Sequence, residues 1–224
     1  MSVLDAIRGQ LIVSVQAPHG SALDDPEAIA AMAAAACEGG AAAVRIESVA
    51  HLKAVRARLG CPIIGLVKRE YSGFAPYITP TLAEVREILA TGVEIVAFDA
   101  TPRPRPDGST LEAIVAEIRR GGALAMADCS AASDARRARD AGAEILATTL
   151  CGYTEETRGS PLPALALVRE LATFDACVIC EGGITTPASG RMALAAGAHA
   201  IVVGTAITGV AHLTRAFAAE LQRG

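Results

Sequence analysis

The sequence lacks an excess of basic residues, a long apolar run and a secretion signal. Its 224 residues carry a formal net charge of -4, whereas nucleic-acid binding needs Lys and Arg clustered on one face. No run of ~18 uncharged apolar residues is long enough to span a membrane, and the N-terminal MSVLDAIRGQ has no basic region followed by an apolar core. We therefore expect a soluble, cytoplasmic protein that binds neither nucleic acid nor a membrane.

A complete metal-binding motif is also missing. Cys177 and Cys180 have the spacing of half a zinc site, but no second CxxC or histidine pair supplies the remaining ligands. Both lie in the apolar run CVIC, which predicts a strand, and residues three apart in a strand point to opposite faces. We expect the six cysteines to be reduced thiols and no metal to be bound.

Apolar residues, in contrast, are abundant. They make up 52% of the sequence and charged residues 20%, a composition that suits strands buried on both faces. A (β/α)₈ barrel typically takes ~250 residues, or ~200 when its loops are short. We therefore predict that residues 1–224 form one domain, with no room for a second.

Short β-rich runs alternate with helix-compatible segments along the chain. The runs that predict strands are 11–15, 42–46, 62–67, 93–98, 123–127, 144–149, 177–180 and 200–204. The segments that predict helices between them are 26–38, 48–59, 82–90, 111–120, 131–141, 162–171 and 187–196. This alternation predicts parallel strands. Eight units without a change of rhythm favour a closed (β/α)₈ TIM barrel over an open doubly wound sheet.

A glycine recurs where a predicted helix gives way to the next strand. Gly40, Gly92, Gly142 and Gly197 each follow a helix and precede an apolar run by a few residues. Glycine ends a helix at little cost because it adopts the left-handed conformation without steric penalty. We interpret the recurrence as a weak internal repeat.

Polar residues stand at the ends of nearly all the predicted strands, where a TIM barrel forms its active site. They are Gln16, Arg45, Lys68, Asp99, Asp128, Thr148 with Thr149, Glu181, and Gly204 with Thr205. Any single charge among them could be half of an ion pair that closes the barrel mouth. Burying a lysine, an arginine and three carboxylates together costs several kcal/mol unless ligands or partners compensate. The whole ring therefore favours a ligand site.

Lys68 and Glu181 each follow an apolar run, so we expect both to be partly buried. Burial lowers the pKa of a lysine and raises that of a glutamate, which moves both toward the range useful for general acid and base catalysis. This would suit proton transfer. A desolvated lysine also supports the alternative chemistry of a Schiff base.

Glycine-rich turns follow the last two predicted strands. The segments EGGIT and VVGTAIT supply Gly182, Gly183, Gly204 and Thr205. Glycines let backbone N–H groups approach an anion, and a helix N-terminus adds a favourable dipole. We predict a phosphate-binding site here, the alternative being two ordinary tight turns.

Several segments carry a family resemblance, in order from Leu11 to about Thr208. They are LIVSVQAPHGSALDDP, GGAAAVRIESV, PIIGLVKRE with YITPTLAEV, FDATPRPRP, ALAMADCS, ILATTLCGYT, VICEGGITTP and GAHAIVVGTAIT. These segments resemble the N-acetylmannosamine-6-phosphate 2-epimerases of amino-sugar and sialic acid catabolism. The resemblance implies a sugar-phosphate substrate, proton exchange at C2 of the sugar, and neither a metal nor a redox cofactor.

The resemblance also implies roles for individual residues. By position, Lys68 and Glu181 match catalytic residues, and Gln16, Arg45 and Asp128 match substrate contacts; we add the strand-end Thr149 as a substrate-binding candidate. Lys68, as the free amine, would remove the C2 proton, while an acid near the carbonyl stabilises the enolate. Glu181 would either return the proton or assist ring opening.

The chain departs from the family pattern at two glycines. The family commonly has arginine where this chain has Gly183, and again where it has Gly209, and the family's arginine at position 209, at least, resembles a phosphate contact. A bidentate contact of this kind contributes roughly 1.5 to 3 kcal/mol, so we expect weaker phosphate binding unless other groups compensate.

These departures leave three other functions open. The first is a flavin-dependent barrel oxidoreductase, in which FMN would occupy the phosphate-binding turns. The second is an aldolase that uses Lys68 as a Schiff base, and the third is a barrel that binds sugar phosphates without catalysis. We also expect a homo-oligomer, because the Ala-rich helical segments 28–37 and 191–196 offer flat apolar surfaces.

Overall fold

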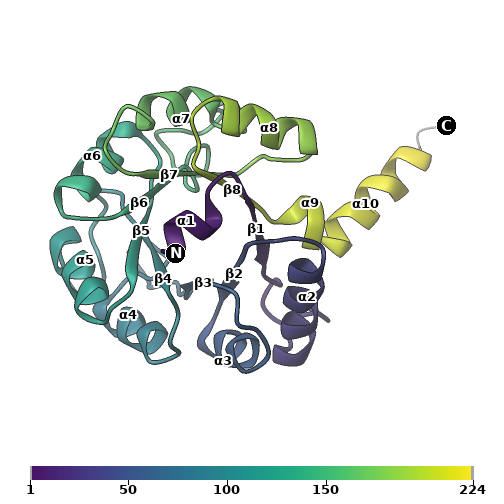
Figure 1. The fold of residues 1–224 in the computed structure, drawn as a ribbon, viewed down its shortest axis with the longest axis horizontal. Coiled ribbons are helices and arrows are strands. Elements are labelled where there is room, and N and C mark those ends of the chain that lie inside the picture. Colours follow the sequence, from purple (N-terminus) through teal and green to yellow (C-terminus); the bar gives the residue numbers. More distant parts are fainter. Residues whose placement is uncertain (1, 223–224) are drawn as a thin grey trace.

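Eight parallel strands close into a barrel that is surrounded by helices (Figure 1). In the computed structural model, which describes residues 2–222, consecutive strands are neighbours and β8 pairs with β1. The strands are β1 Leu11–Val15, β2 Ala43–Glu47, β3 Ile63–Leu66, β4 Ile95–Asp99, β5 Leu124–Asp128, β6 Ile145–Ala147, β7 Cys177–Glu181 and β8 Ala200–Val203. The predicted TIM barrel is confirmed, and the open doubly wound sheet is excluded.

A helix follows each of the first seven strands. These are α2 Pro26–Glu38, α3 Val49–Arg58, α4 Leu82–Leu89, α5 Leu111–Arg120, α6 Ala132–Asp140, α7 Leu165–Leu171 and α8 Pro187–Ala195. Their bounds agree with the predicted segments to within a residue, except that α7 begins later than predicted. Leu162 precedes Pro163, and the residue before a proline disfavours the helical conformation.

The glycines at the helix-to-strand junctions behave as predicted. Gly40, Gly92, Gly142 and Gly197 have φ angles of 100, 74, 98 and 108°, all in the left-handed region. Each lets the chain leave a helix and turn directly into the next strand.

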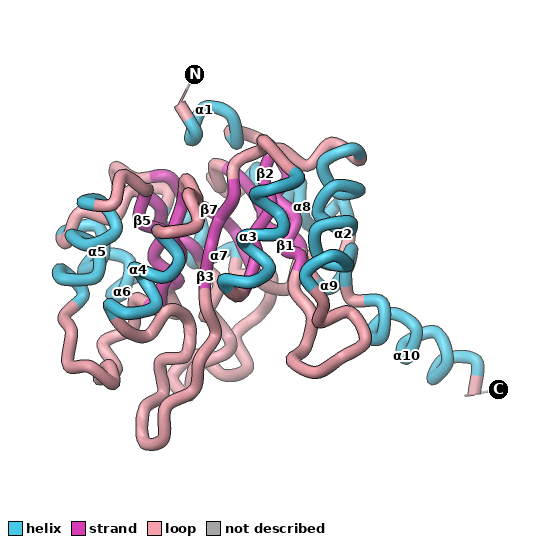
Figure 2. The backbone as a smooth tube through the Cα atoms, turned by 90° about the horizontal axis from the view of Figure 1, so that it is seen from below, coloured by secondary structure: helices cyan, strands magenta, loops and turns pink. Residues whose placement is uncertain are grey.

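Side chains of the strands alternate between two hydrophobic clusters. Residues such as Ile12 fill the barrel interior, and neighbours such as Val13 pack outward against the helices. The short helix α1 (Val3–Ile7) inserts the fully buried Ile7 into the interior cluster. It therefore closes the N-terminal end of the barrel, where Figures 1 and 2 show it.

The two cysteines of CVIC lie on opposite faces of β7, as predicted. Cys177 belongs to the interior cluster and Cys180 to the outer one. Burial raises the pKa of the Cys177 thiol to about 12 and that of the Cys180 thiol to about 11. Within residues 2–222, no group of three or more His, Cys, Asp or Glu side chains is placed to hold a metal ion.

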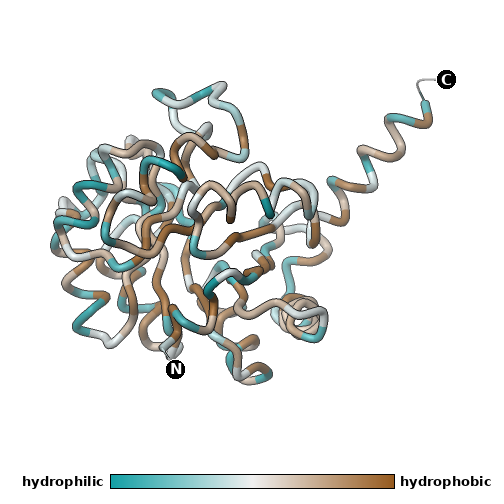
Figure 3. Tube along the Cα trace, turned by 45° about the horizontal axis from the view of Figure 1, so that its top comes forward, coloured by the Kyte–Doolittle hydropathy of each residue, from teal (hydrophilic) through white to brown (hydrophobic). Residues whose placement is uncertain are grey.

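The chain after β8 leaves the barrel. The short helix α9 (Thr205–Thr208) leads into α10 (Val210–Leu221), which projects away from the body (Figures 1 and 3). None of the residues of α10 is buried, and Phe217 and Leu221 are 74% and 83% exposed. Neither helix is among the segments predicted from the sequence. Across the described residues, no helix has the length and apolar character needed to cross a membrane.

Candidate active site

Strand alternation directs the polar residues at the strand ends into the barrel mouth. Ala43, Met126 and Ile179 belong to the interior cluster, and Arg45, Asp128 and Glu181 stand two residues beyond them on the same strands. Because side chains two apart in a strand share a face, these three charged groups also point inward. They form the layer above the apolar interior.

Arg45 joins this layer into one cluster. Its guanidinium donates to both carboxylate oxygens of Asp128, over 2.6 and 3.1 Å, and also to Glu181. Thr149 completes what we call the Arg45 cluster: its hydroxyl donates to Asp128 over 2.6 Å and lies 3.3 Å from both Arg45 and Glu181. The structure thus brings four of the predicted site residues together.

The Arg45 cluster is shielded from water. The side chains of Arg45, Asp128 and Glu181 are 1%, 0% and 14% exposed. Burial alone would lower the pKa of Arg45, but the charges of Asp128 and Glu181 raise it, so the guanidinium stays charged. Burial raises the pKa of Glu181, Asp128 raises it further, and Arg45 opposes both. Glu181 therefore holds a proton more readily than an ordinary glutamate.

Lys68 meets the expectation of partial burial only at its ammonium group. It follows β3 and is exposed as a residue, whereas Glu181 is largely covered as expected. Loss of water around the ammonium still lowers the pKa of Lys68, and the Arg45 charge lowers it further against the opposing pull of Glu47. The ammonium makes no ion pair with any residue in the described part of the chain. Lys68 is thus an amine without an ion-pair partner in the described chain, beside a buried ionic cluster.

Two other strand-end residues serve local structure. The carboxylate of Asp99 accepts hydrogen bonds from the Thr101 backbone at 2.9 Å, the Thr101 hydroxyl at 2.6 Å and the Arg103 guanidinium at 2.6 Å. Thr148 donates its hydroxyl to the carbonyl of Glu181 over 2.9 Å. Asp99 therefore fixes the loop after β4, and Thr148 holds the backbone of Glu181.

Gln16 makes no hydrogen bond to the Arg45 cluster within the described residues. Its side chain is half-buried and donates to the Ser14 hydroxyl over 2.8 Å. Ser14 in turn lies against Gly204, where an added Cβ would be 3.3 Å from the Ser14 Cβ. Gln16 is thus next to the turn that follows β8.

The backbone favours glycine at two positions of the predicted phosphate turns, Gly182 and Gly183. Gly182 and Gly183 have φ angles of 102 and 71°. A Cβ on Gly183 would overlap the Leu162 side chain and lie 3.1 Å from the Leu162 carbonyl carbon. The loop after β6 therefore occupies the space that a side chain at position 183 would need.

Gly209 is restricted in a similar way. A Cβ there would lie 2.6 Å from the Thr205 carbonyl oxygen, within the turn that joins α9 to α10. Gly204 precedes α9, and Thr205, its first residue, is exposed. The positions where the family resemblance expects arginine are thus both positions where this backbone excludes a side chain.

Two residues near Lys68 were missed by the sequence analysis. Glu47 ends β2 and accepts a hydrogen bond from the Lys68 backbone N–H over 3.2 Å. Tyr77 lies after Lys68 in the same loop and packs against the interior cluster. The period-two pattern from Arg45 would have indicated Glu47, but the predicted strand ended at residue 46. Tyr77 carried no comparable signal.

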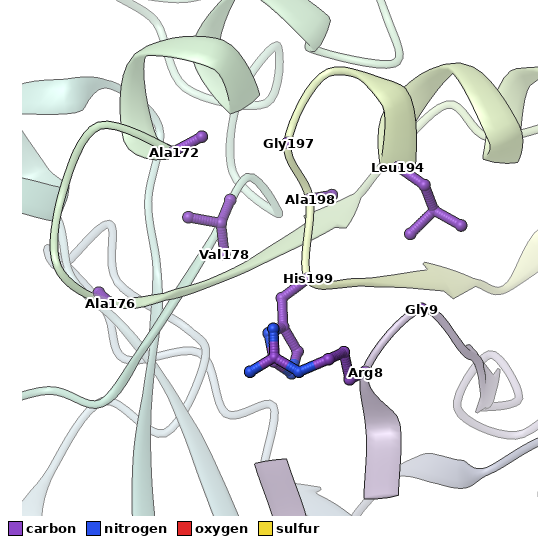
Figure 4. A pocket seen from close by; sticks show the side chains of 9 residues that line it. All are labelled: Arg8, Gly9, Ala172, Ala176, Val178, Leu194, Gly197, Ala198 and His199. Carbon is purple, nitrogen blue, oxygen red and sulfur yellow. The ribbon is translucent and has the colours of Figure 1, made fainter. Parts of the chain in front are cut away.

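A separate cavity of about 440 Å³ lies at the opposite, N-terminal end of the barrel (Figure 4). It is lined mainly by small apolar side chains, with Arg8 and His199 as its ionisable groups. His199 is structural, because its ring nitrogen lies 2.8 Å from the Leu4 carbonyl and its own carbonyl accepts from Gly9 N–H over 2.7 Å. The acid and base groups gather at the other end.

The chain is similar to one protein family along most of its length. The family model described as "Putative N-acetylmannosamine-6-phosphate epimerase" matches residues 29–223. A relative with the corresponding 2-epimerase name, from Enterobacter sp. (strain 638), is 42% identical over 226 residues, which cover 99% of this chain and 96% of the relative. Another from Edwardsiella ictaluri (strain 93-146) is 45% identical over 215 residues, covering 96% and 90%.

The fold is also similar to a solved structure. It matches the N-acetylmannosamine-6-phosphate 2-epimerase from Clostridium perfringens with a TM-score of 0.94 and 40% sequence identity. The match covers 97% of this chain and 96% of that one, so it extends over the barrel and its connecting loops.

Proposed function

Because this chain belongs to the N-acetylmannosamine-6-phosphate epimerase family, we propose that it interconverts N-acetylmannosamine 6-phosphate and N-acetylglucosamine 6-phosphate, with residues 1–224 as one catalytic domain. This reaction belongs to amino-sugar and sialic acid catabolism. One observation carries the chemistry: Lys68, an amine with a lowered pKa, stands beside Glu181, a carboxyl with a raised pKa. That pairing suits a base and an acid in one proton transfer, because the pKa of each group moves toward the neutral range.

The proposed reaction is proton exchange at C2 of the sugar. When the ring opens to the aldehyde, the C2–H bond becomes acidic because the electron pair left behind is shared with the carbonyl as an enolate. Lys68 as the free amine takes the proton, and delivery of a proton to the opposite face of C2 inverts the centre. Glu181, as the protonated acid, either supplies that proton or assists ring opening.

The Arg45 cluster has a supporting role in this proposal. Its guanidinium keeps Asp128 and Glu181 oriented, and the hydroxyl of Thr149 bridges the two carboxylates. We assign Arg45, Asp128, Thr149 and Gln16 to substrate binding. Oriented charges in a dry site act more strongly on a substrate than the same charges in water.

We place the substrate phosphate at the turns after β7 and β8. Gly182, Gly183, Gly204 and Thr205 offer backbone N–H groups, and the three glycines carry no side chain of their own. Without arginine at positions 183 and 209, these N–H groups supply the phosphate contacts. We therefore expect modest affinity for the phosphate.

The decisive experiment is incubation with N-acetylglucosamine 6-phosphate in deuterated water, followed by NMR. We expect deuterium at C2 and formation of the manno product. Absence of both would overturn the proposal. The same preparation separates the alternatives: a yellow protein indicates bound flavin, trapping by borohydride indicates an aldolase Schiff base, and binding without exchange indicates a non-catalytic barrel.

We further propose that the protein acts in the cytoplasm as a homo-oligomer whose copies associate through α10. The support is the exposure of apolar side chains on a helix that leaves its own barrel (Figure 3). A second copy would cover Phe217 and Leu221, removing them from water. Light scattering should give a mass above that of one chain, and Phe217→Glu with Leu221→Glu should lower it. A monomeric wild type would contradict this.

A further inference from the structure

The segment after β3 forms a hairpin that extends beyond the strand ends (Figure 2). We call residues 67–79 the β3 hairpin. Lys68 pairs with Ile78 and Tyr71 with Phe74, both in antiparallel bridges. Lys68 is therefore on the outgoing arm, and Tyr77 stands on the returning arm almost opposite it.

The returning arm is anchored on both sides of the hairpin. The carbonyl of Tyr77 accepts from Arg69 N–H over 2.9 Å, and that of Ile78 accepts from Asp99 N–H over 2.9 Å. Thr79 is fully buried; its N–H donates to the Val67 carbonyl over 2.7 Å and its hydroxyl to the Ala97 carbonyl over 2.7 Å. These bonds fix the backbone of Tyr77.

Thr79 adopts a conformation that is unfavourable for its residue type. Its φ angle is 44°, in the left-handed region that a β-branched side chain rarely enters. Such a conformation persists only where the surroundings hold it, as the hydrogen bonds of Thr79 do, and such positions cluster at functional sites. The arm that carries Tyr77 is thus held in one place at a conformational cost.

The side chain of Tyr77 is half-buried over the barrel interior, against residues of the interior cluster. Its hydroxyl has no hydrogen-bond partner among residues 2–222. The other tyrosine of the hairpin differs: the Tyr71 hydroxyl donates to Glu84 over 2.7 Å. The Tyr77 hydroxyl is therefore available for a hydrogen bond to a ligand in the barrel mouth. The Tyr71 hydroxyl is already bonded to Glu84.

We propose that Tyr77 is a substrate-contacting residue whose hydroxyl donates a hydrogen bond to an oxygen of the bound sugar phosphate, beside Lys68. This inference rests on the proposed function, since it takes that reaction's substrate as the ligand. Burial, then the charges of Asp128 and Asp99, raise the pKa of Tyr77. The phenol stays protonated in the working range, so it acts as a donor and not as a second base.

The matched pair Tyr77→Phe and Tyr71→Phe tests this assignment, because each removes one hydroxyl from the same hairpin. A neutral hydrogen bond is modest in net strength, so Tyr77→Phe should lower kcat/KM by about 3- to 10-fold, and Tyr71→Phe should leave it unchanged. In the Lys68→Ala background, calorimetry should show the same weakening for binding of N-acetylglucosamine 6-phosphate. Thermal unfolding checks that Tyr77→Phe is folded.

The outcomes separate this inference from the proposed function. An active wild type with Tyr77→Phe equal to it in kcat/KM and in binding overturns the role of Tyr77 alone. An equal loss in both tyrosine variants also overturns it, because the loss would then belong to the hairpin as a whole. A wild type that neither binds nor converts the sugar phosphate overturns both.

Discussion

The Arg45 cluster and the β3 hairpin lie at the same barrel mouth but are built in opposite ways. In the cluster each charged group is largely buried and paired. Arg45 makes a bidentate contact with Asp128 and a further contact with Glu181. On the hairpin, Lys68 is exposed and unpaired within the described chain. The contrast indicates that the two regions have different roles: the cluster holds a fixed pattern of charges that includes the proposed acid Glu181, and the hairpin presents the proposed base Lys68.

The largest effect on stability should come from the cluster. Arg45→Met leaves two carboxylates buried without their cation, so we expect the free energy of unfolding to fall by about 3 to 5 kcal/mol. Lys68→Met should change it by no more than about 0.5 kcal/mol, because that residue is exposed and unpaired. Urea unfolding measures both. Equal losses in the two variants would remove the distinction between cluster and hairpin.

The half-buried ion pair between Arg56 and Glu94 offers a control for this comparison. Its N and O atoms are 2.6 Å apart, as close as those of Arg45 and Asp128, but the two side chains are 26% and 32% exposed. Arg56→Met should therefore cost less than about 1 kcal/mol. A similar cost for Arg56→Met and Arg45→Met would mean that burial does not set the strength of the cluster.

A smaller loss should follow at the phosphate turn. Gly183 and Gly159 both have φ in the left-handed region, 71 and 83°, but only Gly183 has Leu162 packed over it. Gly159→Ala should lose about 1 kcal/mol from backbone strain, and Gly183→Ala about 1 to 3 kcal/mol more from the overlap. Thermal unfolding of the two variants measures this difference in stability. Equal stability of the two variants would show that the loop after β6 moves aside freely.

The smallest expected effect is on the pH dependence of activity. Lys68 must lose its proton to act as a base, so activity should be lost as the pH falls through its pKa, which lies below the ordinary lysine value. Glu47 raises that pKa, so Glu47→Gln should move the acidic limb of kcat/KM to lower pH. Glutamine keeps an oxygen for the Lys68 N–H, and Glu112→Gln on α5 serves as a distant control. A limb that shifts to higher pH, or not at all, would contradict the role of Lys68.

Much of the barrel could be predicted because it follows from local patterns. Alternating β-rich and helical segments and the junction glycines at 40, 92, 142 and 197 each depend on a few neighbouring residues. The departure of α10 could not be predicted in this way. Its apolar residues show that one face favours burial, but the sequence does not specify the surface against which that face packs.

The candidate site was predictable where it depends on strand alternation and not where it depends on loops. Arg45, Asp128 and Glu181 were identified because each lies at or near the end of a strand, and the structure joins them. Asp99 ends a strand too, but Thr101 and Arg103 in the following loop donate hydrogen bonds to it. A loop has no periodic sequence pattern from which these contacts could be predicted. The same limit concealed the exposure of Lys68 and the position of Tyr77, since both depend on the β3 hairpin.

The most direct test of this account is C2 hydrogen exchange in the Lys68→Ala variant. With N-acetylglucosamine 6-phosphate in deuterated water, the wild type should incorporate deuterium at C2, and Lys68→Ala should do so about 10² to 10⁴ times more slowly while unfolding at the same urea concentration. Exchange at a near-normal rate in a folded Lys68→Ala protein would contradict the account, because Lys68 would then not be the base.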